Sequence, residues 1–133
     1  MVATLAVASL AGCGMQTPEA SSGLGTPVIE AVGVSAFAEV VSRPEVIVLD
    51  VRTPAEFAEG HIPDSINIDV ESPDFPDRVA ELDKGAIYAV YCRSGRRSAV
   101  AAEQLAAAGF TQVYDLAGGV IDWAAAGLPL VTN

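Results

Sequence analysis

The chain has 133 residues, of which 51% are hydrophobic, and its 7 Lys and Arg against 17 Asp and Glu give a formal net charge of −10. This length suits one domain with a sizeable core, and the acidic balance argues against nucleic acid or an anionic membrane surface as a partner. With one histidine and only two cysteines, Cys13 and Cys92, the chain shows no disulfide framework and no metal-ligand cluster, so we expect neither metal nor cofactor.

The first 15 residues are almost wholly small and apolar, and they are too few to span a bilayer as a helix. The stretch Leu10-Ala11-Gly12-Cys13 resembles the lipobox of bacterial lipoprotein signal peptides, in which the cysteine is lipidated. The resemblance implies a signal segment over residues 1–13, a lipid on Cys13 and a flexible tether over residues 14–26. The lipid would be the only membrane attachment, holding the protein in the bacterial cell envelope outside the cytoplasm.

One feature of this segment departs from the lipoprotein pattern. A signal peptide begins with a basic region, whereas the first basic residue of this chain is Arg43. The alternative is the apolar N-terminus of a cytoplasmic protein. In either case the predicted folded domain is restricted to residues 27–133.

Short strands alternate with helices along this domain. The predicted strands cover residues 28–32, 46–50, 65–68, 86–91 and 112–115. The predicted helices cover residues 35–41, 54–60, 78–82, 99–108 and 119–126. The strands are nearly continuous apolar runs, which is typical of parallel strands buried on both faces. The order therefore predicts a single α/β domain with a mostly parallel sheet and helices on both faces.

Three of the helices carry signals for their first residues. Ser35 and Ser98 each precede a run of helix formers and are predicted N-caps. Thr53 and Glu56 have the spacing of a capping box, with Pro54 at the first helical position. Capping is thus a sufficient explanation of Glu56.

The polar loop after the strand at residues 86–91 concentrates reactive and charged residues. It begins at Cys92 and contains Arg93, Arg96 and Arg97, three of the seven basic residues of the chain. Unpaired amides at a helix N-terminus and nearby cations bind anions and favour a thiolate over a thiol. Ligands of such sheets also lie at the carboxyl ends of the strands. We therefore expect an ionised, solvent-accessible sulfur within a cup of amides and guanidinium groups; the alternative is a core cysteine.

Four motifs follow one another in the order of a known family. They are Leu49-Asp-Val-Arg52 with Pro54, Glu56 and Phe57; Gly60-His-Ile-Pro63 with Asn67-Ile68; Tyr91-Cys-Arg-Ser-Gly-Arg-Arg-Ser98; and Leu116-Ala-Gly-Gly119 with Trp123 and Gly127-Leu-Pro129. With these motifs, residues 28–131 resemble a single rhodanese domain, the sulfurtransferase module. The resemblance implies the rhodanese-like α/β fold.

The resemblance also implies a reaction. Cys92 would be the catalytic residue: its thiolate takes sulfane sulfur from a small anion such as thiosulfate, or from another persulfide donor. The resulting persulfide would pass that sulfur to a thiol or a cyanide-like acceptor. The substrate-binding residues would be Arg93, Ser94, Gly95, Arg96 and Arg97. The thiolate and the persulfide are both anions, and both suit a loop preorganised for negative charge.

The other motif residues have a structural and a functional interpretation. Asp50 and Arg52 could form a structural ion pair or orient the active-site loop, and we assign them, with Ser98, a supporting role. His61 is expected to belong to a structural turn rather than to act as a general base. Trp123 is expected to be a core aromatic residue.

Two alternatives to the sulfurtransferase are open. Dual-specificity phosphatases of the cell-cycle type share this fold but need an arginine six residues after the cysteine, where this chain has Ser98. The shorter loop favours sulfur over phosphate. The second alternative is a non-catalytic rhodanese-like module that carries sulfur or binds a protein, although inactive relatives typically lose the cysteine that this chain keeps.

A location outside the cytoplasm would expose a reactive thiolate to oxidation.

Overall fold

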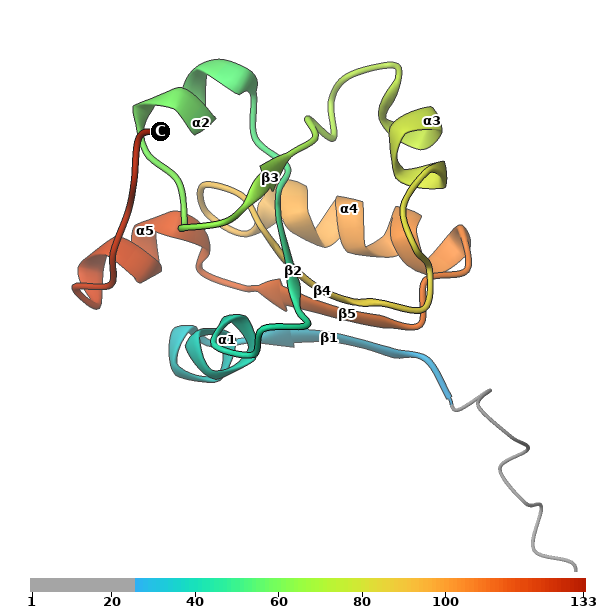
Figure 1. Cartoon of the computed structure of the whole chain (residues 1–133), viewed down its shortest axis with the longest axis horizontal. Helices are drawn as coiled ribbons and strands as arrows, with labels where there is room; N and C mark the ends of the chain where they lie inside the picture. Colours follow the sequence, from blue (N-terminus) through green and yellow to red (C-terminus); the bar gives the residue numbers. More distant parts are fainter. Residues whose placement is uncertain (1–25) are drawn as a thin grey trace, which may run out of the picture.

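A five-stranded parallel sheet forms the centre of the computed structural model, which describes residues 26–133 (Figure 1). The strand order is β1-β5-β4-β2-β3. The strands are β1 (Val28–Val32), β2 (Ile47–Asp50), β3 (Ile66–Asn67), β4 (Ile87–Tyr91) and β5 (Gln112–Leu116). The predicted signal segment, and all of the predicted tether except Thr26, lie outside the described residues.

Helices cover both faces of this sheet. They are α1 (Val34–Val41), α2 (Pro54–Glu59), α3 (Phe75–Ala80), α4 (Arg96–Ala107) and α5 (Gly119–Ala125). One core cluster contains buried residues of α3 and α4, and the other contains buried residues of α1 and α5. The predicted α/β class, parallel sheet and two covered faces are therefore confirmed. None of the helices in this part of the chain has the length and hydrophobicity needed to cross a membrane.

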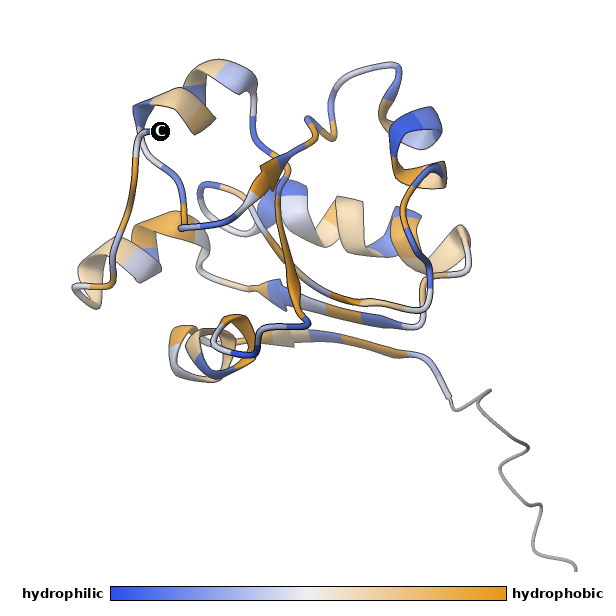
Figure 2. Cartoon of the chain, viewed as in Figure 1, coloured by the Kyte–Doolittle hydropathy of each residue, from blue (hydrophilic) through white to orange (hydrophobic). Residues whose placement is uncertain are grey.

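The side chains of strand β4 alternate between the two core clusters. Tyr88 and Val90 pack in the cluster under α3 and α4, whereas Ala89 and Tyr91 pack in the cluster with α1 and α5. Successive side chains of a strand point to opposite faces, so a central strand with apolar residues at every position fits only between two layers. Figure 2 shows these apolar strands, with hydrophilic residues at the start of α4.

The starts of three helices differ from the sequence prediction. Helix α1 begins at Val34 with Gly33, not Ser35, at the N-cap. Helix α3 begins at Phe75, three residues before the predicted start, with a proline in its first turn. Helix α4 begins at Arg96 with Gly95 at the N-cap. The prediction of Ser98 as N-cap is therefore wrong, because the two arginines before it already belong to the helix. The capping box of Thr53 and Glu56 in α2 is confirmed.

Candidate active site

The loop between β4 and α4 packs tightly against the turn between β5 and α5. A Cβ atom on Gly95, whose φ is 101°, would overlap the carbonyl oxygen of Ala117. A Cβ on Gly119 would overlap the backbone of Arg93 in the same way. The loop therefore needs glycine at both positions, since both have a positive φ unfavourable to other residues and both allow a close backbone approach.

Backbone hydrogen bonds from α5 hold this loop in place. The N–H of Val120 donates to the carbonyl oxygen of Cys92 at 2.9 Å, and that of Ile121 donates to the carbonyl oxygen of Arg93 at 3.1 Å. The carbonyl groups at the start of the loop thus point toward α5. The motif Leu116-Ala-Gly-Gly119 therefore contributes to the site by supporting the loop that holds Cys92.

Amides of the loop surround the sulfur of Cys92. The N–H of Gly95 donates to Sγ at 3.0 Å. Burial, the largest effect, raises the pKa of the thiol, but hydrogen bonds from the hydroxyl and amide of Ser98 and from the amides of Gly95 and Ser94 act in the opposite direction. The pKa of Cys92 consequently lies below its ordinary value. The predicted cup of amides is present.

The sulfur is not open to solvent, which corrects one expectation from the sequence. Cys92 is only 1% exposed and belongs to the core cluster beneath α4. The cause is its place at the end of β4, because the side chain packs in the same cluster as Val90 of β4 and Ala101 of α4. Cys92 is therefore at once a core residue and the centre of an anion cradle. Arg93 and Ser94, which follow it, are exposed.

The three arginines of the loop have different environments. The guanidinium of Arg97 forms a two-point ion pair with Glu56 of α2, at 2.7 and 2.8 Å. This hydrogen bonding lowers the pKa of Glu56 to about 2. Capping thus accounts for only part of the role of Glu56, because its carboxylate also binds Arg97 of α4. Arg93 and Arg96 are exposed, and neither belongs to an ion pair among the described residues.

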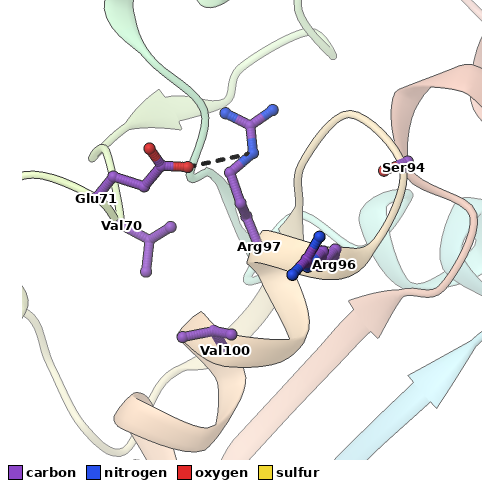
Figure 3. Close-up of a pocket in the computed structure, with 6 residues that line it drawn as sticks. All are labelled: Val70, Glu71, Ser94, Arg96, Arg97 and Val100. Carbon is purple, nitrogen blue, oxygen red and sulfur yellow. Dashed lines mark ion pairs between the residues drawn. The ribbon is translucent and has the colours of Figure 1, made fainter.

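A surface cavity of about 470 Å³ opens beside the loop. Figure 3 shows Arg97 extending from the start of α4 toward Glu71, whose carboxylate lies 4.0 Å from the arginine Nε. Arg96 lies beside Arg97 on the same helix (Figure 3). The lining also includes exposed Val100 on α4, together with Ser94 and Val70. Glu71 and Val70 could not be predicted from the sequence, because they reach the loop only through the tertiary fold. Val100 follows Arg97 by one turn of α4 and was also not predicted.

Asp50 and Arg52 form a buried ion pair at the end of β2. The Arg52 guanidinium binds both oxygens of Asp50, with the shortest contact at 2.7 Å, and also donates to the carbonyl oxygen of Gly60 at 2.7 Å. The side-chain amide of Asn67 donates to the carbonyl oxygens of both residues. The pair thus joins β2, the end of α2 and β3, and its contacts are those of a structural ion pair.

His61 and Trp123 also have structural surroundings. His61 is 4% exposed, stacks on the Phe57 ring at 3.7 Å, and has Nδ1 2.9 Å from the Phe57 carbonyl oxygen. Its backbone pairs with Val131. Trp123 is 4% exposed and donates from Nε1 to the Pro129 carbonyl oxygen at 2.9 Å. His61 thus belongs to a structural turn and Trp123 to the core, as the sequence predicted for each.

Two further polar residues are buried, one in the first turn of α4 and the other near the end of β5. Ser98 is the third residue of the helix and is fully buried, and its hydroxyl donates to the carbonyl oxygen of Gly95 at 3.2 Å. Asp115, near the end of β5, is 5% exposed, and its Oδ1 has no hydrogen-bond partner. The sequence analysis did not single out Asp115; the signal was an acid inside an otherwise apolar strand end. No cluster of metal-ligand type occurs among residues 26–133.

Similarity to known proteins agrees with this geometry. Residues 34–126 match the rhodanese-like domain family. A sulfurtransferase from Allochromatium vinosum is 42% identical over 87 residues, which cover 65% of this chain and 79% of that protein. A thiosulfate sulfurtransferase from Pseudomonas syringae is 37% identical over 86 residues, covering 65% and 79%.

The fold has the same relationship to solved structures. The crystal structure of a rhodanese-related protein from Thermoplasma volcanium superimposes with a TM-score of 0.69 at 33% identity, covering 78% of this chain and 99% of that one. The motifs, the parallel sheet and the cysteine loop at its carboxyl edge thus lead to one assignment. The chain belongs to the rhodanese family, in which its relatives include proteins named as sulfurtransferases.

Proposed function

We propose that this protein is a sulfurtransferase that carries sulfane sulfur as a persulfide on Cys92. The observation that carries the proposal is the sulfur itself, which accepts a hydrogen bond from the amide of Gly95 at 3.0 Å and has a lowered pKa. A thiolate is the nucleophilic form of cysteine, and a loop of donors that stabilises it also stabilises a persulfide anion. The names of the relatives from Allochromatium and Pseudomonas support the same chemistry.

The proposed reaction has two displacements at sulfur. With thiosulfate as donor, the Cys92 thiolate attacks the outer sulfur, the bond between the two donor sulfurs breaks, and sulfite leaves with the electron pair. The product is the Cys92 persulfide. A thiol or cyanide acceptor then attacks the outer sulfur of the persulfide, and the Cys92 thiolate leaves. Both steps balance without a redox partner, and neither needs a metal or another cofactor.

The donor anion is proposed to bind at the mouth of the cavity beside the loop. Arg96 lines this cavity and Arg93 lies in the same loop; both are exposed with no ion pair among the described residues, so their charge is available to an arriving anion. The guanidinium of Arg97 is engaged by Glu56. Of the three predicted arginines, we therefore assign donor attraction to Arg93 and Arg96, and the holding of α4 to Arg97.

One observation favours a second candidate, a sulfur-carrier module that protects its persulfide until a partner protein removes it. Cys92 is 1% exposed, which suits storage better than rapid exchange with small molecules. The two candidates differ in turnover. A sulfurtransferase releases product repeatedly with thiosulfate and cyanide, whereas a carrier loads once and transfers sulfur only to its partner.

The test is to incubate the purified protein with thiosulfate and to look for one added sulfur atom by mass spectrometry. We expect the adduct on the wild type, its removal by cyanide and its absence from Cys92→Ser. A protein that gains no sulfur, or a Cys92→Ser variant that gains the same sulfur, overturns the proposal. Repeated thiocyanate formation then distinguishes the enzyme from the carrier.

We also propose that Cys13 is lipidated and that this lipid anchors the protein to the cell envelope. The support is the sequence Leu10-Ala11-Gly12-Cys13 and the polar stretch that follows it. In this arrangement the domain would work next to a membrane, without contacting nucleic acid.

A further inference from the structure

The cavity beside the cysteine loop has two chemically different parts. Its volume is about 470 Å³, and Arg96 and Arg97 line it with positive charge, whereas Val70 and Val100 line it with apolar surface. Cavities of this size hold organic molecules and combine an apolar lining with a few polar groups that fix orientation. Thiosulfate is a small inorganic anion without carbon, so it leaves the apolar part of the cavity without a partner.

Val100 is an exposed apolar side chain on the helix that follows the cysteine loop. It is 47% exposed, and it lies on α4 four residues after Arg96 and three residues after Arg97. Residues three and four apart lie on the same side of a helix. The valine therefore follows the two arginines along the side of α4 that lines the cavity (Figure 3).

Val70 comes from the segment after β3, and the main chain holds it in place. Its N–H donates to the carbonyl oxygen of Val51, just after β2, at 3.1 Å. Its side chain is partly buried and packs against the core cluster that contains Cys92. Ser94, two residues after the cysteine, lines the same cavity. A molecule in this cavity can therefore contact the cysteine loop and the apolar surface at once.

The charges around the cavity favour a singly charged anion. Arg97 is already held by Glu56, and the carboxylate of Glu71, which is 63% exposed, lies 4.0 Å from the Arg97 Nε. This second carboxylate cancels part of the attraction for a dianion such as thiosulfate. Among the described residues that line the cavity, Arg96 is the guanidinium left to bind one negative head group.

We propose that Val70 and Val100 form a subsite for the apolar body of an organic sulfane-sulfur anion, whose negative head binds at Arg96. This inference rests on the proposed function and names the class of its donor, an organic thiosulfonate, in which a hydrocarbon group replaces one oxygen of thiosulfate. The Cys92 thiolate attacks the outer sulfur, the bond between the two donor sulfurs breaks, and an organic sulfinate leaves with the electron pair. The product is the same Cys92 persulfide, and no redox partner is needed.

The binding of unreactive sulfonates tests the subsite without any sulfur transfer. Benzenesulfonate and methanesulfonate have the same charged head and differ in the apolar body, and neither carries a sulfur that can be transferred. Their dissociation constants are measured by NMR titration of the full chain, followed at the backbone amides of Ser94 and Arg96. We expect benzenesulfonate to bind about tenfold more tightly, because part of its ring is covered by apolar surface.

Val100→Ser is expected to reduce this ratio to about threefold, since one of the two apolar side chains is lost. Serine and valine have similar helix propensities and the position is exposed, so the variant should fold. Leu130→Ser, the control, removes a 40% exposed side chain outside the cavity lining and should leave the ratio unchanged. Arg96→Ala should weaken both sulfonates by the same factor, because it acts on the head. Equal affinities for the wild type, or an unchanged ratio in Val100→Ser, overturn the inference.

Rates of persulfide formation then separate this inference from the proposed function. Benzenethiosulfonate and methanethiosulfonate are compared as donors, and Val100→Ser should lower the preference in kcat/KM for the first about threefold. Comparing the two proteins cancels the difference in intrinsic reactivity between the donors. Persulfide formed with the same preference in both proteins overturns the inference alone. No persulfide from either donor, with the sulfonate ratio as expected, overturns the proposed function while supporting the subsite.

Discussion

Arg97 and Glu56 join the first turn of α4 to α2 through a two-point ion pair with N–O distances of 2.7 and 2.8 Å. Each side chain is about one quarter exposed, at 23% and 26%. The same carboxylate accepts from the backbone N–H of Thr53 at 3.1 Å, so one side chain both caps α2 and holds α4. The pair fixes the helix whose N-terminus faces Cys92.

Loss of this pair is expected to lower stability and to weaken the site. Glu56→Gln should reduce the free energy of unfolding by about 1–2 kcal/mol, because it removes a charge-assisted contact at a partly exposed position and weakens the cap. Arg97→Gln should cost a similar amount. A double-mutant cycle by urea denaturation checks the coupling, and additive losses would contradict the described contact.

The contribution of Glu56 should depend on pH in one direction. Its pKa is about 2 in the folded protein against 4.5 ordinarily, so the folded state favours the ionised form. The stabilisation is therefore complete above about pH 4.5 and is lost as the pH falls toward 2. Denaturation at a series of pH values should show the difference between wild type and Glu56→Gln shrinking across this window. A difference that grows toward low pH would contradict the assignment.

The tight loop predicts a specific sensitivity at Gly95. Gly95→Ala should cost at least about 2 kcal/mol, since the new Cβ meets a carbonyl oxygen at a positive φ, and it should abolish persulfide formation. Gly127→Ala is the matched control: Gly127 also has a positive φ, of 75°, but no atom lies within 4 Å of its added Cβ. It should cost only about 1 kcal/mol and leave sulfur loading intact. Equal effects of the two changes would show that the close approach of Ala117 to Gly95 is not the cause of the sensitivity.

The exposed arginines should affect the donor rather than the sulfur. Arg93→Ala and Arg96→Ala are each expected to raise the KM for thiosulfate about two- to fivefold, the size of one partly screened charge contact. Added salt should reduce the difference from wild type. Arg43→Ala, an exposed arginine after α1, should leave the KM unchanged. An equal effect of Arg43→Ala would mean that only net charge matters.

The lipid anchor gives a prediction outside the described residues. Labelled fatty acid should be incorporated by the wild type expressed in bacteria and not by Cys13→Ala, because the thiol of Cys13 is the proposed attachment point. Fractionation should then move the variant from the membrane to the soluble fraction. Unlabelled wild-type protein in the soluble fraction would contradict the proposal.

Local sequence signals predicted most of the elements but not how they meet. The apolar run at Val46–Asp50 and the capping box at Thr53 are local features, and both predictions are confirmed. The strand order, the Arg97–Glu56 pair and the orphaned oxygen of Asp115 depend on residues far apart in the chain. The burial of Cys92 was missed for the same reason, since its side chain packs in a core cluster with residues of β2, α4 and β5. The start of α4 was misplaced because arginine is itself a good helix former.

Main-chain amides provide most of the hydrogen bonds to the sulfur and all of the hydrogen bonds from α5 to the loop. A substitution leaves those atoms in place as long as the glycines remain. The outward side chains of the loop can therefore vary without rebuilding the sulfur cradle. Substitutions at a few exposed positions of the loop can therefore change which molecules bind there, while Cys92 and the amides around it stay the same.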